Sequence, residues 1–136
     1  MKRTNWILIC IILLGCVLRL IHIDKPEGLW NDEYVSWFVS SIPFNNGFWD
    51  EVLKQCHMPL YYLYLKPFSS CSDLVLRLTS VIPSVLSIPV MYLIGKEFTQ
   101  KAGLIAALIT ASLSFLIYYA QEVRFYSLLF LFSALL

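Results

Sequence analysis

The chain has 136 residues, of which 59% are hydrophobic and only 14% are charged. Soluble domains average about half apolar and about a quarter charged residues, so this composition excludes an ordinary soluble domain and indicates an all-α polytopic membrane protein. The formal net charge of +1 gives no reason to expect nucleic-acid binding. An apolar run still continues at residues 132–136, and we read residues 1–136 as the N-terminal part of a longer protein.

Residues 6–23 form the first apolar segment, which is long enough for a transmembrane helix. The segment follows Lys2-Arg3, so the positive-inside rule places the N-terminus in the cytoplasm of a multi-pass cell-membrane protein. Arg19 and His22 lie near its outer end, where a long side chain can snorkel toward water. A lipoprotein signal peptide ending at Cys16 is the alternative, but the chain stays apolar far beyond that residue.

Residues 24–73 are predicted to form a loop on the outer side of the membrane. Aromatic residues at i, i+3 and i+4 predict a short helix, with Asn31 or Asp32 as its N-cap and Pro43 at its end. The aromatic face of this helix consists of Tyr34, Trp37 and Phe38. A second amphipathic helix has an apolar side made of Phe48, Trp49, Val52 and Leu53. Because Trp and Tyr favour the headgroup region, we expect both helices to lie on the membrane surface.

The tyrosine-rich segment Met58–Phe68 is too short to span a bilayer, so we expect it to stay on the outer side. Cys56 and Cys71 flank this segment. They either form a disulfide in an oxidising compartment or remain free thiols, and the sequence leaves both alternatives open.

The remaining apolar runs determine the sidedness of the chain. These runs are 74–95, 102–119 and the start of another at 125–136. The short loop Lys96–Lys101 carries an excess of positive charge and fits the cytoplasm. Counting crossings from the N-terminus therefore places Asp32 and Glu122 together on the outer side.

Asp32 and Glu33 are the first candidates for chemistry. In a structural interpretation they are an N-cap and a first-turn acid that the helix dipole stabilises. In a chemical interpretation, a carboxylate at the outer face acts as general base on an incoming hydroxyl. Arg77 opens a membrane helix, where it either snorkels or binds a phosphate through its guanidinium fork. The spacing of these residues leaves both interpretations open.

A polar cluster separates the last apolar runs. Charges beside membrane-length segments are costly, so they tend to be kept for function or placed at the water boundary. Glu122 and Arg124 are two residues apart and do not face each other on a regular helix, so the backbone is irregular there or each has its own partner. His57 is either a solvated histidine or a ligand for a lipid phosphate or a metal.

Four short motifs follow one another along the chain. They are Leu29-Trp30-Asn31-Asp32-Glu33, His57-Met58-Pro59-Leu60-Tyr61-Tyr62, Leu76-Arg77-Leu78-Thr79-Ser80 and Tyr119-Ala120-Gln121-Glu122-Val123-Arg124-Phe125-Tyr126. In this order they resemble the motifs of GT-C membrane glycosyltransferases that use polyprenyl-phosphate sugars, such as protein O-mannosyltransferases and bacterial lipid A aminoarabinose transferases. Met58 and Thr79 replace prolines of the family pattern, which loosens local rigidity without removing a functional group.

The resemblance implies a GT-C-like fold, with juxtamembrane helices and the catalytic acid in the first outer loop. It implies inverting transfer of a sugar from a polyprenyl-phosphate donor to a glycan, lipid or protein acceptor outside the cytoplasm. Asp32 would be the general base, supported by Glu33, and Glu122 would position the acceptor or a divalent metal. The implied substrate-binding residues are His57, Arg77, Gln121, Glu122, Arg124 and Tyr126.

A transporter fragment is the alternative function, because transporters also place charges at helix ends. It would require helices broken near the bilayer midplane, for which Pro83 and Pro89 are the sequence signals. We further expect residues 1–136 alone to be inactive and poorly folded, because they provide few helices to enclose their own charges.

Overall fold

The computed structural model describes residues 2–55 and 58–136, and within these ranges the protein contains helices and no strand. The elements in chain order are α1 (Lys2–Leu20), α2 (Asn31–Ser41), α3 (Asn46–Gln55), α4 (Pro59–Leu65), the 3-10 turn η1 (Lys66–Phe68), α5 (Asp73–Lys96), α6 (Gln100–Ser112), α7 (Ser114–Ala120) and α8 (Tyr126–Leu135). The all-α prediction is confirmed for these residues.

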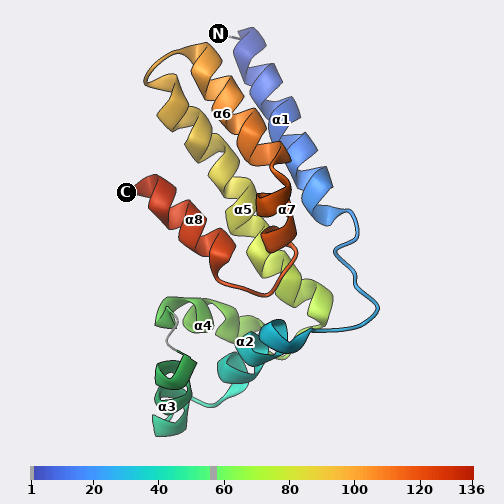
Figure 1. The fold of residues 1–136 in the computed structure, drawn as a ribbon, viewed down its shortest axis with the longest axis vertical. Helices are drawn as coiled ribbons and strands as arrows, with labels where there is room; N and C mark the ends of the chain where they lie inside the picture. The colour runs from blue at the N-terminus through green and yellow to red at the C-terminus, as the bar shows by residue number, and fades with distance from the viewer. Residues whose placement is uncertain (1, 56–57) are drawn as a thin grey trace.

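The helices form a long bundle with a smaller layer at one end (Figure 1). In the bundle, α1, α5 and α6 lie side by side, α7 follows α6 toward the smaller layer, and α8 packs against α5. The smaller layer consists of α2, α3 and α4, and α3 lies at the far tip of the molecule. This arrangement brings the turn after α7 next to α2, although the two are far apart in the sequence.

Helix α5 is the central element of the bundle. Asp73 stands in its first turn and Lys96 in its last, where each charge complements the helix dipole. By length and composition, α5 is the one helix within the described ranges that could cross a membrane by itself. Helices α6 and α7 would make a second span if they are counted as one element bent by 54°. The expected number of membrane crossings therefore stays a prediction.

Several predicted boundaries differ from the structure. The run 102–119 was expected to be one helix, but it breaks at Leu113 between α6 and α7. The first helix ends at Leu20, earlier than the predicted end of segment 6–23, because the backbone turns and His22 adopts a φ of 60°. Trp30 is the N-cap residue of α2, so the prediction of Asn31 or Asp32 as N-cap is wrong.

The smaller layer has a hydrophobic core of its own. Its buried members are Val39, Phe48, Val52, Tyr61, Tyr62, Leu65, Leu76 and Val123. The prediction that segment Met58–Phe68 forms a short element rather than a span is confirmed, because it consists of α4 and η1. On α3 only part of the predicted apolar side is buried: Trp49 and Leu53 remain exposed.

Close packing joins α5 to α6. A Cβ added to Gly103 would lie 2.7 Å from the carbonyl oxygen of Tyr92, and one added to Gly95 would lie 2.9 Å from the Cα of Gly103. Both distances are shorter than side chains tolerate, so these glycines allow the two helix backbones to approach each other. The close packing of the hairpin that α5 and α6 form therefore requires glycine at both positions.

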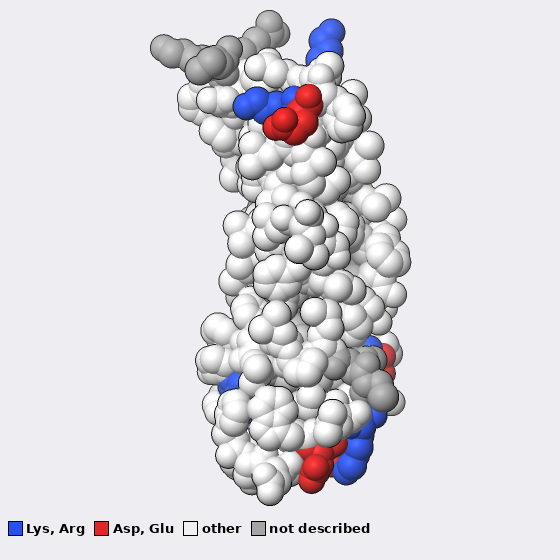
Figure 2. Space-filling view, turned by 90° about the vertical axis from the view of Figure 1, so that its left-hand side faces the viewer, with Lys and Arg blue, Asp and Glu red and all other residues white. Residues whose placement is uncertain are grey.

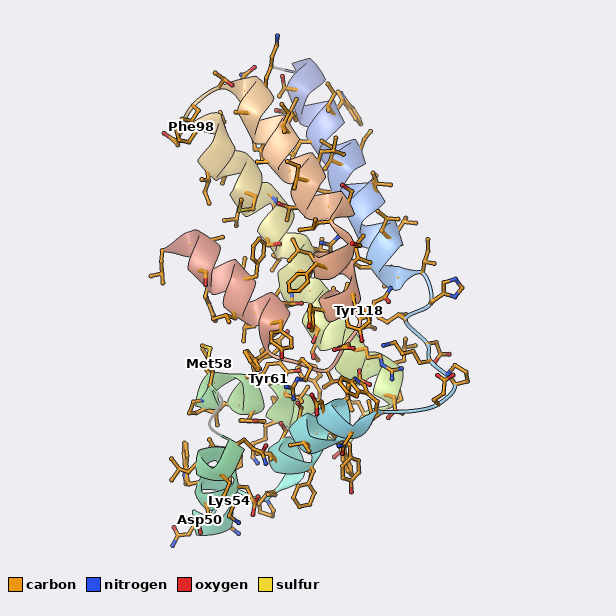
Figure 3. All side chains as sticks on the ribbon, in the orientation of Figure 1. Asp50, Lys54, Met58, Tyr61, Phe98 and Tyr118 are labelled. Carbon is orange, nitrogen blue, oxygen red and sulfur yellow. The ribbon has the colours of Figure 1, made fainter. Side chains whose placement is uncertain are left out.

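Charged side chains gather at the two ends of the long axis, and an uncharged band lies between them on the face shown in Figure 2. Figure 3 places Phe98, in the loop between α5 and α6, near the end of the molecule opposite Asp50 and Lys54, with Tyr118 and Tyr61 between them. Cys71 is a free, exposed thiol. Cys56 and His57 lie outside the described residues, so their predicted roles are not addressed by the structure.

Candidate active site

A buried ion pair connects the smaller layer to the bundle. Glu33 on α2 and Arg77 on α5 are both inaccessible to solvent. The Arg77 guanidinium donates from Nε to Glu33 Oε1 at 3.1 Å and from Nη2 to Oε2 at 3.0 Å, which is the two-pronged geometry that makes such pairs strong. This pair fixes the first turn of α2 against the start of α5.

Both members of the pair have further partners. Glu33 also accepts hydrogen bonds from the backbone amides of Trp30 at 3.2 Å and Val123 at 3.0 Å. Arg77 also donates to the carbonyl oxygens of Ile23 at 3.3 Å and Gly28 at 2.6 Å. Glu33 therefore fixes the turn after α7, and Arg77 fixes the chain after α1.

Asp32 has a different environment from its neighbour. Its side chain is 46% exposed, and its Oδ2 lies 3.5 Å from Nη2 of Arg124. Adjacent residues in a helix point in different directions, so Glu33 faces the interior while Asp32 faces a cavity. The cavity has a volume of about 110 Å³ and is lined by Trp30, Asp32, Tyr118, Tyr119, Glu122, Arg124 and Tyr126. The prediction that the acidic pair and the later cluster meet is thus confirmed.

Arg124 lies in the non-helical turn between α7 and α8, which confirms one of the two alternatives for this cluster, an irregular backbone. Its guanidinium lies 5.8 Å from the ring centroid of Phe125 and 5.6 Å from that of Tyr126. Its Nη1 donates to the carbonyl oxygen of Asp32 at 3.3 Å. The side chain is largely buried, yet it borders the cavity, so an anion in the cavity would meet a partly desolvated positive charge.

Glu122 is 2% exposed and borders a second cavity as well as the first. The second cavity has a volume of about 270 Å³ and is lined by Lys25, Glu27, Gly28, Trp30, Glu33, Tyr118 and Glu122. Within the described ranges, no lysine or arginine forms a salt bridge with Glu122. The Tyr118 hydroxyl is a hydrogen-bond partner of this carboxylate, so a ligand that donates hydrogen bonds would share the carboxylate with Tyr118.

An apolar groove adjoins the charged cavity. The groove has a volume of about 250 Å³ and is lined by Ser84, Phe115, Leu116, Tyr119, Tyr126, Ser127, Leu129, Phe130 and Ser133. Tyr119 and Tyr126 belong to both sites, and their rings lie 4.4 Å apart between centroids. The charged cavity and the apolar groove therefore meet at these rings.

The structure places the other predicted residues elsewhere. The amide nitrogen of Gln121 donates to the carbonyl oxygens of Ile21 at 2.7 Å and Arg19 at 3.3 Å, so it binds the end of α1 and does not line the cavity. Arg77 likewise lines none of these cavities. In the part of the chain that the structure describes, no group of three or more His, Cys, Asp or Glu residues is placed to hold a metal ion.

Tyr61 on α4 packs against the turn between α7 and α8. Its hydroxyl is buried and has no hydrogen-bond partner among the described residues, while its ring packs 6.5 Å from that of Phe125. Burial raises the pKa of this hydroxyl above its ordinary value, so it stays neutral at physiological pH. Tyr61 therefore supports the turn through apolar packing.

Sequence reasoning missed several residues of the site. Trp30, Tyr118 and Tyr119 line the cavities. Trp30 and Tyr119 belong to the recognised motifs, and their position beside charged residues was the available signal.

Arg19 was expected to snorkel, but this is wrong because the side chain is fully buried inside the bundle.

A scan against protein-family models and searches of curated proteins and of solved structures found no match to this chain. The assignment of function therefore depends on the motifs and on the geometry of the site.

Proposed function

We propose that this chain forms part of a multi-pass cell-membrane glycosyltransferase of the GT-C type, which transfers a sugar from a polyprenyl phosphate to an acceptor outside the cytoplasm. The observation that carries the proposal is the junction between a cavity lined by Asp32 and Arg124 and an apolar groove, at Tyr119 and Tyr126. A polyprenyl-phosphate sugar has the same division into an apolar chain and a charged head.

The donor fits this junction in one orientation. Its isoprenoid chain would lie in the groove between α7 and α8, where Phe115 and Phe130 offer apolar contacts. Its phosphate would then reach Arg124, whose planar guanidinium suits a phosphate better than a lysine ammonium would. Because Arg124 contacts Asp32 at 3.5 Å, a phosphate at this arginine would replace the carboxylate as its partner.

The transfer step uses the carboxylate that the phosphate has released. An acceptor oxygen or nitrogen forms a bond to the anomeric carbon while the bond from that carbon to the phosphate oxygen breaks, with inversion. The acceptor proton moves to Asp32, which serves as general base. The bonding electrons leave with the polyprenyl phosphate, and Arg124 stabilises the charge that develops there.

The neighbouring acidic residues have distinct roles in this proposal. Glu33 positions Asp32 by fixing the first turn of α2, since its own oxygens are bonded to Arg77, Trp30 and Val123. Glu122 is free of salt bridges to the described residues and borders both cavities, so it accepts hydrogen bonds from the acceptor.

The alternative of a transporter gains one observation, because α6 and α7 form a helix pair bent by 54°. Broken helices in transporters leave backbone groups facing a substrate or ion. Here the carbonyl oxygens of Thr110 and Ala111 at the break accept hydrogen bonds from Arg19. Since these carbonyls are occupied inside the bundle, the break does not favour an ion site.

The test is the substitution Asp32→Asn in the complete protein, assayed with a panel of polyprenyl-phosphate sugars. The amide keeps the shape of the side chain but cannot accept the proton, so transfer should fall by about 10²–10⁴-fold while donor binding persists. Asp50→Asn, on exposed α3 far from the cavity, is the matched control and should retain full activity. Wild-type turnover by Asp32→Asn would assign the base to another residue and contradict the proposed role of Asp32.

A further inference from the structure

Arg19 is buried within the bundle and is not used by the proposed reaction. Its guanidinium donates to the Ser84 hydroxyl at 2.7 Å, to the carbonyl oxygens of Gly15 and Ala111 at 3.0 Å each, and to that of Thr110 at 2.9 Å. It forms no salt bridge with any described residue. A fully buried cation bonded to carbonyl dipoles is expensive to maintain, so its position calls for an explanation.

The acceptors of Arg19 lie at the break between α6 and α7. Sharp bends in helices usually occur at proline, at Gly/Ser pairs, at π-bulges, or where a side chain or water inserts into the ladder of hydrogen bonds. The residues around Leu113 include neither proline nor glycine, but serines flank it on both sides, and Ser112 donates to the carbonyl oxygen of Leu108 at 2.8 Å. Thr110 and Ala111 belong to the last turn of α6, where carbonyl oxygens lose their helical partners and the dipole attracts a cation. Arg19 binds the two carbonyl oxygens at this break.

The bend between α6 and α7 determines the direction of α7. Helix α7 carries Tyr118 and Tyr119, and it leads into the turn that contains Glu122 and Arg124. These side chains line the cavity that faces Asp32. A continuous helix in place of α6 and α7 would carry them in a different direction, because the observed change of direction is 54°.

We propose that Arg19 is a positioning residue, which maintains the break between α6 and α7 and thereby orients α7 toward Asp32. A second contact from the same helix supports this role. Gln121, just after α7, donates to the carbonyl oxygens of Arg19 and Ile21 at the end of α1. The end of the first helix therefore contacts the chain just before α7, at Thr110 and Ala111, and just after it, at Gln121.

The structure offers a way to restore the bend without Arg19. Leu113 has φ −65° and ψ 117°, which is the conformation that a residue before proline prefers. Ser114 is exposed and is the first residue of α7, the helical position at which proline is best tolerated. Ser114→Pro should thus be compatible with the break and should prevent α6 and α7 from forming one helix.

The experiment compares the complete wild-type protein with Arg19→Met, Arg19→Lys, Ser114→Pro and the double variant Arg19→Met/Ser114→Pro. Spin labels at positions 105 and 118, in a background where the four native cysteines are replaced, report the distance across the break. Ile105 and Tyr118 are 58% and 55% exposed, so both positions accept a label. Sugar transfer is measured separately on unlabelled proteins.

We expect Arg19→Met to shift and broaden the distance distribution and to lower kcat by about tenfold or more, because small misplacements are costly in catalysis. The KM for donor should rise as well, because Phe115, Leu116 and Tyr119 of the groove lie on α7 and Arg124 lies in the turn that follows it. Arg19→Lys should be intermediate, because an ammonium lacks the planar fork. Ser114→Pro should match the wild type, and the double variant should recover both the distance and most of the activity.

Two results would overturn the inference: an unchanged distance distribution in Arg19→Met, or no recovery in the double variant. If Arg19→Met does not fold, a folded double variant with the wild-type distance supports the inference, and an unfolded double variant refutes it. The activity measurement rests on the proposed glycosyl transfer. The distance measurement does not, so a protein without transferase activity would still test the role of Arg19.

Discussion

At the scale of single residues, two adjacent carboxylates have opposite environments. Glu33 is fully buried and paired with Arg77, whereas the side chain of Asp32 is about half exposed and borders a cavity. Removing one member of a buried ion pair leaves the other charge uncompensated, which costs far more than losing an exposed pair. The two residues should therefore respond differently to the same chemical change.

We expect Glu33→Gln to lower the free energy of unfolding by about 3–5 kcal/mol, because it leaves the guanidinium of Arg77 buried without a counter-charge. Thermal or denaturant unfolding in detergent measures the change. Glu51→Gln is the control, since Glu51 pairs with the well-exposed Lys54 on α3 and its loss should leave stability unaltered. Equal unfolding curves for Glu33→Gln and the wild type would show that the pair does not fix α2.

The sequence singled out two residues that line the cavity, but it did not predict the buried contacts of Glu33 and Arg77. Asp32 and Arg124 are recognisable from short motifs whose spacing is local. The bond between Glu33 and Arg77 joins residues 44 positions apart, and Val123 donates to Glu33 across 90 positions. Such pairings depend on how helices pack, so no local pattern distinguishes a buried Arg77 from one that binds phosphate.

At the scale of elements, most helices followed from hydrophobic runs, but the break in the run 102–119 did not. Every residue in that run is compatible with a helix. The interruption at Leu113 depends on Arg19 from α1, which bonds the carbonyl oxygens at the end of α6. A feature imposed by another helix is invisible to any rule that examines one segment at a time.

The contact between α5 and α6 leads to a prediction about stability. Gly103→Ala should lower the free energy of unfolding by about 1–3 kcal/mol, because its Cβ would overlap the backbone oxygen of Tyr92 and the helices must separate. Gly47→Ala on α3 is the matched control: the nearest atom to its Cβ is a side-chain oxygen of Asn45 at 3.2 Å, and alanine favours a helix.

Gly47→Ala should therefore leave stability unchanged or raise it, and unfolding in detergent followed by circular dichroism measures both variants. If Gly103→Ala is as stable as the wild type, the close approach of α5 and α6 is not required for the hairpin.

At the scale of the whole molecule, charged side chains gather at the two ends of the long axis with an uncharged band between them on the face shown in Figure 2, and the orientation across a bilayer stays a prediction. We predict that a cysteine at position 50 reacts with an impermeant maleimide from outside the cell, whereas one at position 98 reacts only after permeabilisation. Asp50 lies at the tip of α3 and exposed Phe98 lies at the opposite end (Figure 3). A permeant reagent that labels both positions is the control.

Labelling of both cysteines from the same side would refute the proposed topology. The meeting of Asp32 and Glu122 in one cavity would be unaffected, because the structure shows it without reference to a membrane. The sequence anticipated that meeting by assigning the short segment Met58–Phe68 to the surface and counting crossings, and both of these steps stay predictions. Which side of the membrane the cavity faces remains a prediction.

Three of the four hydrogen-bond acceptors of Arg19 belong to residues that the ribosome synthesises long after Arg19. Its guanidinium bonds Ser84 at a separation of 65 residues, and Thr110 and Ala111 at separations of 91 and 92 residues. A ribosome that adds 5–20 residues per second needs roughly 5–18 s to synthesise the last of these partners. During this interval the carbonyl oxygen of Gly15, in the same helix, is the acceptor already available to Arg19. Until α5 and α6 have been synthesised, Arg19 therefore lacks three of the four acceptors that it has in the complete bundle.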